Sequence, residues 1–134
     1  MENDMKKKLS ILSLCLVFTL ALTSLFSCGT NLTRIDIVGD GVRVDDNGEK
    51  YVVVYLDEND KATYKLEYEL LPYDHKPVDI DISYNKNLPG VTLGEDGVFE
   101  FSAVTGVEVT VSGKGANSRI IEDKIFIFVK HKNL

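Results

Sequence analysis

Tryptophan is absent from this 134-residue chain, and cysteine, histidine, methionine and proline are scarce. The two histidines, His75 and His131, lack the neighbouring serine, cysteine or carboxylate pattern that predicts a catalytic triad or dyad. No stretch after residue 28 keeps a 3.6-residue hydrophobic period, so we expect no helices there. These absences argue against an enzyme, and we expect neither a cofactor nor catalytic residues.

The N-terminal segment carries an export pattern. Three lysines, Lys6 to Lys8, precede an apolar stretch that ends in Leu25-Phe26-Ser27-Cys28. This order resembles a bacterial lipoprotein signal with its lipobox: a branched aliphatic residue, a small residue before the cut, and a thiol. The resemblance implies a cleaved signal peptide over residues 1–27 and a diacylglyceryl group on Cys28. It also implies a protein that is lipid-anchored at the extracytoplasmic face of a bacterial membrane.

This segment has two other interpretations. Cys15 follows Leu14, which is too bulky for the cleavage subsite, so we expect Cys15 to leave with the signal peptide. An uncleaved membrane helix is the second alternative, because residues 9–27 approach the ~20 residues that span a bilayer. Six serines and threonines dilute that run and favour cleavage.

Residues 28–134 would remain after cleavage, and their size and charge restrict the kind of domain they form. They contain 12 basic and 19 acidic residues, a net charge of −7. This acidity argues against binding to nucleic acid and against electrostatic adsorption to anionic lipid. A chain of this length is expected to form one domain. Acylation of Cys28 would leave no free thiol, so packing and sheet hydrogen bonds must stabilise that domain.

Apolar and polar residues alternate along most of the remaining chain, with turn signals between the runs. The pattern predicts strands at residues 32–38, 51–56, 63–71, 78–84, 91–93, 98–101, 107–111 and 120–130. Seven or eight antiparallel strands separated by frequent turns are typical of an all-β Greek-key sandwich. The alternation places Leu66, Ile80, Ile82 and Tyr84 inside, and Asp81 outside.

Four segments together resemble the group 2 bacterial Ig-like family. They are 64–72, which ends in proline, 78–84, the hairpin of 91–93 with 97–101, and the glycine-led 106–111. The resemblance implies an Ig-like sandwich over residues 32–130, between a tether at 28–31 and a tail at 131–134. Members are non-catalytic adhesion and spacer modules. The chain departs from the family in lacking tryptophan and in a longer insertion at 39–50.

The tether favours a role close to the membrane. Leu32 is only four residue steps from Cys28, a reach of about 14 Å at ~3.5 Å per residue. We therefore expect a lipid-anchored, non-catalytic module that binds a protein or glycan partner near the membrane. The alternative is an accessory subunit or inhibitor of an envelope hydrolase or carbohydrate-processing system.

Polar and aromatic residues in two loops are the expected partner-binding residues: Arg43, Tyr73, Asp74 and His75. The insertion that carries Arg43 has a second interpretation, a hairpin without a binding role. Phe126 and Phe128 lie opposite apolar residues on the last strand, so either this strand is buried on both faces or one face is a sticky patch.

The loops at 45–48 and 57–60 are rich in carboxylates but lack the ligand spacing of a calcium-binding loop. Turn formation is the simpler interpretation of these residues. No metal site is predicted.

Overall fold

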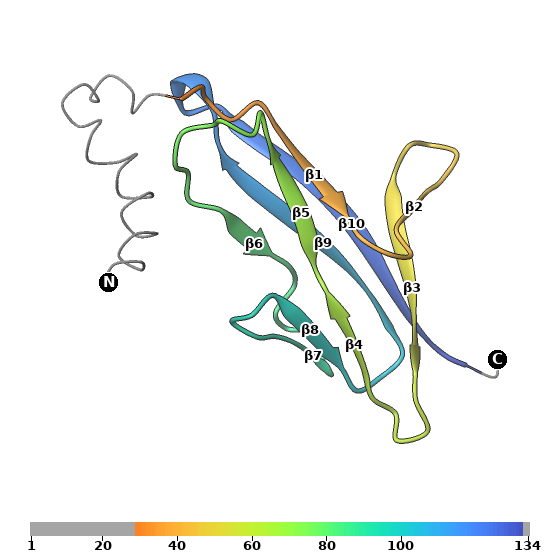
Figure 1. Ribbon diagram of the computed structural model, residues 1–134. Coiled ribbons are helices and arrows are strands. Elements are labelled where there is room, and N and C mark those ends of the chain that lie inside the picture. Colours follow the sequence, from red (N-terminus) through yellow and green to blue (C-terminus); the bar gives the residue numbers. More distant parts are fainter. Residues whose placement is uncertain (1–28, 133–134) are drawn as a thin grey trace, which may run out of the picture.

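The computed structural model describes residues 29–132, which form an all-β domain (Figure 1). Its strands are β1 (Arg34–Val38), β2 (Arg43–Val44), β3 (Lys50–Leu56), β4 (Ala62–Lys65), β5 (Glu67–Leu71), β6 (Asp81–Ser83), β7 (Val91–Leu93), β8 (Val98–Phe101), β9 (Thr105–Lys114) and β10 (Ile120–His131). A single 3₁₀ turn, η3 (Ala116–Ser118), joins β9 to β10. The expected all-β class is confirmed.

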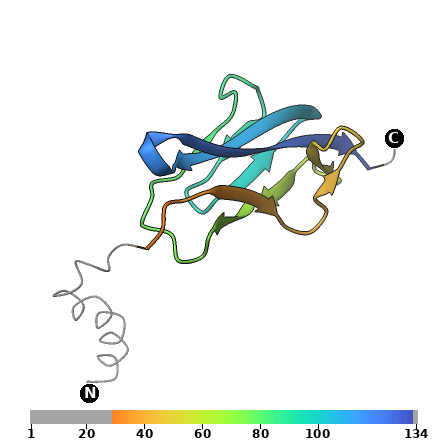
Figure 2. The ribbon, with the colours of Figure 1, turned by 90° about the horizontal axis from the view of Figure 1, so that it is seen from above.

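The strands form two layers, which Figure 2 shows from above. One layer is the five-stranded sheet β2-β3-β10-β9-β6. The second layer contains the pair β1-β5 and the sheet β4-β8-β7. β4 and β5 are one run of chain interrupted at Leu66, whose N–H donates to the Gly97 carbonyl at 3.0 Å. This arrangement is an Ig-like Greek-key sandwich, as the sequence predicted.

The core lies between the two layers and takes alternate side chains from β1, β3, β8, β9 and β10. Its buried members are Leu32, Ile35, Ile37, Val52, Leu56, Leu66, Val91, Phe99, Phe101, Val107, Val109, Val111, Ile125, Ile127 and Val129. Leu66 is buried as predicted, whereas Ile80, Ile82 and Tyr84 are half-buried. The strand β6 that carries Ile82 is at the edge of its sheet, and Ile80 and Tyr84 flank it outside the ladder. Asp81 is exposed, as predicted.

The structure differs from the prediction in strand number and in one pairing. It has ten strands instead of seven or eight, because Leu66 divides one predicted strand and the insertion at 39–50 contributes β2. β3 runs parallel to β10, with Tyr51 beside Phe126. The chain leaves the second layer after β1 and enters the five-stranded layer as β2, and β3 then runs in the direction of the last strand.

The strands extend from Arg34 at the start of β1 to His131 at the end of β10. The predicted signal peptide and Cys28 lie outside the described residues. Within residues 29–132, no helix is long and apolar enough to cross a membrane.

Two neighbouring residues of β10 test the assignment of its faces. Ile127 is 0% exposed and Phe128 is 38% exposed. Ile127→Ala should lower the free energy of unfolding by about 2 to 5 kcal/mol, as large-to-small core changes do. Phe128→Ala should cost less than about 1.5 kcal/mol, because the ring already contacts water. Urea unfolding of both variants measures this, and equal losses would contradict the assignment.

Candidate functional site

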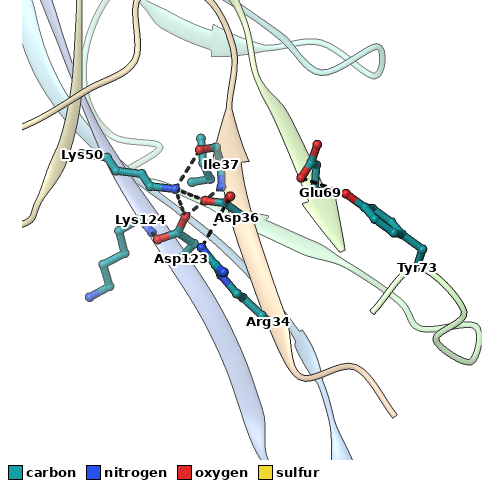
Figure 3. Close-up of polar contacts among 8 residues, drawn as sticks. All are labelled: Arg34, Asp36, Ile37, Lys50, Glu69, Tyr73, Asp123 and Lys124. Carbon is teal, nitrogen blue, oxygen red and sulfur yellow. Dashed lines mark hydrogen bonds and ion pairs between the residues drawn. The ribbon is translucent and has the colours of Figure 1, made fainter. Parts of the chain in front are cut away.

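The loop after β5 contains three of the expected partner-binding residues. Tyr73 is 77% exposed, and its hydroxyl lies 3.5 Å from Glu69 Oε1 (Figure 3). Asp74 is engaged with the start of the domain: its carbonyl accepts from the Thr30 N–H at 3.2 Å, and its Oδ1 accepts from the Thr30 hydroxyl at 3.2 Å. The Lys76 N–H donates to the Thr30 carbonyl at 2.7 Å, and His75 forms a bridge with Thr30. This loop therefore fixes Thr30, near the start of the described residues, to the end of β5.

Arg43, the fourth expected residue, lies in the other layer. It is exposed on β2, opposite Tyr51 of β3. β2 forms one edge of the five-stranded sheet, whereas the Tyr73 loop follows a strand of the second layer (Figure 1). Tyr73, Asp74 and His75 lie together because they are consecutive in the sequence. The structure does not bring Arg43 next to them.

The two acidic loops are closed by their own side chains. Asp45 Oδ1 accepts hydrogen bonds from the N–H groups of Asn47 at 2.8 Å and Glu49 at 2.9 Å. Asp57 closes its loop in the same way. These are Asx turns, in which the carboxylate satisfies backbone donors. Within the described part of the chain, no group of three or more His, Cys, Asp or Glu side chains is arranged to hold a metal ion.

An aromatic face covers part of the outer side of the five-stranded sheet. We use this name for Tyr51, Val53 and Tyr55 of β3 together with Phe126 and Phe128 of β10, which alternation directs outward. The rings of Phe126 and Phe128 stack with centroids 4.8 Å apart, and Tyr51 meets Phe128 edge-on at 6.2 Å. Phe126 and Phe128 remain 37% and 38% exposed. β10 is therefore buried on one face only, and its other face carries an apolar patch.

A glycine on the neighbouring strand makes room for these rings. Gly106 of β9 lies opposite Phe128. A Cβ at this position would stand 3.1 Å from Cε1 of Phe126, tighter than ordinary van der Waals contact. The missing side chain thus allows the Phe126 ring to lie over the sheet. Glycine beneath an aromatic ring is a known device for stabilising sheets, so Gly106 also explains why Phe126 is partly covered.

Beside the aromatic face lies a polar hollow of about 310 Å³. It opens between the β2–β3 turn and the first half of β10. Its lining residues are Gly48, Glu49, Lys50, Glu108, Glu122, Asp123, Lys124, Ile125 and Phe126. Phe126 belongs to both features, so the hollow and the aromatic face form one continuous surface.

A cluster of charged side chains, which we call the Lys50 clasp, joins the two layers behind this hollow. Lys50 Nζ of β3 donates to Asp36 of β1, to Asp123 Oδ2 of β10 at 2.7 Å and to the Ile37 carbonyl at 2.7 Å (Figure 3). Asp123 Oδ2 also accepts from the Ile37 N–H at 2.8 Å. The side chain of Lys50 is 18% exposed. The clasp therefore ties the open edge of β1 to the opposite sheet.

The electrostatics of the clasp indicate a fixed ion group. Burial acts to lower the pKa of Lys50, but the hydrogen bonds to Asp123 and Asp36 outweigh it and raise the pKa above its ordinary value of 10.5. The hydrogen bond from Lys50 lowers the pKa of Asp36 below 3.8, against the effect of burial. Both groups stay charged at neutral pH, so Lys50 has no free amine for nucleophilic chemistry. Sequence analysis missed this cluster because its members lie on three distant strands.

Comparisons with known proteins give little to add to this geometry. No protein-family model matches the chain, and no curated protein matches it. A crystal structure of a Bacteroides fragilis protein assigned as an alpha-galactosidase is similar over 77% of this chain, with a TM-score of 0.39 and 9% identity. This chain spans 18% of that protein. A likeness of this strength carries no argument about function.

The clasp predicts a pH-dependent contribution to stability. Because the folded-state pKa of Lys50 is raised, its contribution is present below pH 10.5 and is lost as pH rises through the folded-state value. Because the pKa of Asp36 is lowered, its contribution is present above about pH 4 and is lost as pH falls through the folded-state value. Lys50→Met should therefore cost about 3 kcal/mol at pH 7, and less at pH 2 and at pH 12.

Urea unfolding at the three pH values measures this difference. Lys124→Met is the matched control, because the Lys124 ammonium lies 4.0 Å from Glu122 and both side chains are largely exposed. Its cost should stay below about 0.5 kcal/mol. A Lys50→Met cost that does not change with pH would show that packing of the lysine stem, and not its charge, stabilises the fold.

Proposed function

We propose that this chain is a lipid-anchored, extracytoplasmic, non-catalytic Ig-like module that binds a protein or glycan partner close to the membrane. The observation that carries the proposal is the aromatic face on the outside of the five-stranded sheet. Phe126 and Phe128 are exposed on the outer side of the sheet. Exposed patches of this kind, rimmed by polar residues, are typical of interaction sites. Aromatic side chains are also the group most enriched at interface centres.

The lipid anchor rests on the sequence Leu25-Phe26-Ser27-Cys28 and on the reach of the residues that follow. Thr30 is already fixed to the loop after β5, two residues beyond Cys28. Leu32 lies against Gly115, at the β9–β10 turn of the sandwich. With Cys28 acylated, this end of the domain would lie next to the membrane.

This orientation separates the two candidate binding regions. Tyr73 lies at the end of the sandwich nearest the anchor, where its ring suits the membrane interface better than a partner protein. Phe126 is six residues along β10 from Ile120, or about 20 Å at ~3.3 Å per residue. The aromatic face is therefore at the side of the domain and open to a partner. Arg43 adjoins it through Tyr51.

The anchor is tested by Cys28→Ala. Without the thiol no diacylglyceryl group is added, and stable attachment depends on acyl chains that contribute ~0.8 kcal/mol per buried methylene. The variant should leave the membrane fraction or accumulate as uncut precursor, and mass spectrometry of the wild type should show an acylated N-terminal cysteine. Unchanged membrane attachment with an uncut N-terminus would instead support a membrane helix.

The binding surface is tested by crosslinking in intact cells followed by quantitative capture. Phe128→Ser should lower partner recovery by at least about 10-fold, since central aromatic residues dominate interface energies. Tyr73→Ala, a matched exposed aromatic in the other layer, should leave recovery unchanged. Melting curves establish that both variants are folded. If recovery falls with Tyr73→Ala and not with Phe128→Ser, the binding surface is the loop and not the aromatic face.

A further inference from the structure

The first half of β10 has a strand partner on one side only. β9 pairs with β10 from Ile120 to Val129. β3 pairs with it only from Phe126 to His131. Along residues 120–125, therefore, no described strand pairs with β10 on the β3 side, although β1 of the other layer approaches β10 through the bond from the Ile37 N–H to the Asp123 carboxylate. Such an edge presents unpaired N–H and C=O groups that can accept another strand.

The hydrogen bonds at the β9–β10 turn fix which backbone groups point to this open side. The Gly115 N–H donates to the Arg119 carbonyl at 2.8 Å, so odd-numbered residues of β10 form the hydrogen-bonded pairs with β9. The N–H and C=O groups of Glu122 and Lys124 then point away from β9. The Lys124 N–H accordingly donates to the side chain of Asp123, at 3.0 Å. The acceptor is the carboxylate of the preceding residue, and the hydrogen bond is exposed to solvent. A carbonyl of an incoming strand can therefore take the place of this carboxylate.

The polar hollow lies directly along this open edge. Residues 122–126 of β10 form one wall, and Gly48, Glu49 and Lys50 form the other. A volume of about 310 Å³ is at the lower end of the range for ligand sites and suits a short extended segment. An added strand would continue the line of β3 beyond Lys50. Backbone hydrogen bonds supply the affinity in this mode of recognition, and alternate side chains supply the specificity.

Charges around the hollow indicate which side chains such a segment carries. Glu49, Glu108 and Glu122 supply three carboxylates, while Lys124 is the exposed cation among them. The remaining charged pair, Lys50 and Asp123, is already joined in the clasp. The rim is therefore acidic, and it ends at the ring of Phe126, which suits an aliphatic side chain or a cation above its face.

We propose that residues 120–125 of β10 accept an extended, basic segment of a partner protein by strand addition. The incoming segment places basic side chains against Glu108 and Glu122 and an apolar side chain against Phe126. This inference rests on the proposed function and specifies that the partner is a protein. It adds an edge site that is continuous with the aromatic face through Phe126.

The experiment uses the full chain, purified in detergent micelles, and a fluorescein-labelled hexapeptide that alternates lysine and valine. Fluorescence anisotropy should show saturable binding. The same peptide with methyl groups on alternate backbone nitrogens should bind at least ~10-fold more weakly, because it cannot complete the strand hydrogen bonds. A hexapeptide that alternates glutamate and valine should not bind. Equal binding of the methylated peptide would overturn strand addition, and so would a lack of binding by the basic peptide.

Three variants locate the site. Lys124→Pro removes an N–H that faces the open side and fills the hollow with a ring, while proline remains tolerated on an edge. It should weaken the peptide at least ~10-fold. Glu108→Lys should weaken it by several-fold or more through charge reversal. Glu100→Lys is the matched control, exposed on β8 of the second layer, and should have no effect beyond the common change in net charge.

The outcomes distinguish this inference from the proposed function. If Lys124→Pro unfolds the domain, Glu108→Lys against Glu100→Lys still decides, and equal effects of these two reversals would overturn the site. Peptide binding should not require Phe128. If Phe128→Ser does not lower partner recovery, the aromatic face is not the binding surface. The peptide measurements then still test strand addition independently.

Discussion

The crossing of the chain from one layer to the other, between β1 and the β2–β3 hairpin, is the constraint on which the rest of this structure depends. β1 pairs with β5 in the second layer, and β3 pairs with β10 in the five-stranded sheet. A strand that stops halfway along β10 leaves the other half of that edge without a partner. The Lys50 clasp lies at this break, where it joins β1, β3 and β10. The hollow and the open edge follow from the same crossing.

Much of the fold was predictable because the alternation of apolar and polar residues along a strand shows which side chains face the core. The predicted strands at 91–93 and 98–101 agree with β7 and β8, and the inward set on β9 and β10 is buried. Alternation indicates which face of the sheet a side chain occupies, but it does not indicate which strand pairs with which. The parallel pairing of β3 with β10 was therefore missed. The strand predicted at 78–84 was too long, since its inward side chains pack on the core while only residues 81–83 form the ladder.

The candidate site was less predictable, since it depends on contacts between distant segments. Tyr73 was selected as a candidate binding residue from its place in a loop, but the role of Asp74 in holding Thr30 appears only when residues 44 positions apart meet. Phe126 and Phe128 could be identified as ambiguous and no more, because an outward aromatic and a doubly buried strand have the same pattern. The ion pairs of Lys50 could not be predicted from the sequence, because its partners Asp36 and Asp123 lie on other strands.

An open strand edge is also a risk, and the features that suit residues 120–125 to one partner protect them against others. Lys124 and the glutamates around the hollow place charge along the edge, which opposes pairing with an uncharged or acidic strand. The bond from the Lys124 N–H to Asp123 satisfies a donor that would otherwise seek any acceptor. The β2–β3 turn forms the far wall and limits the length of chain that can enter. The edge therefore favours extended segments with basic side chains, because such segments both replace the lost hydrogen bond and neutralise the acidic rim.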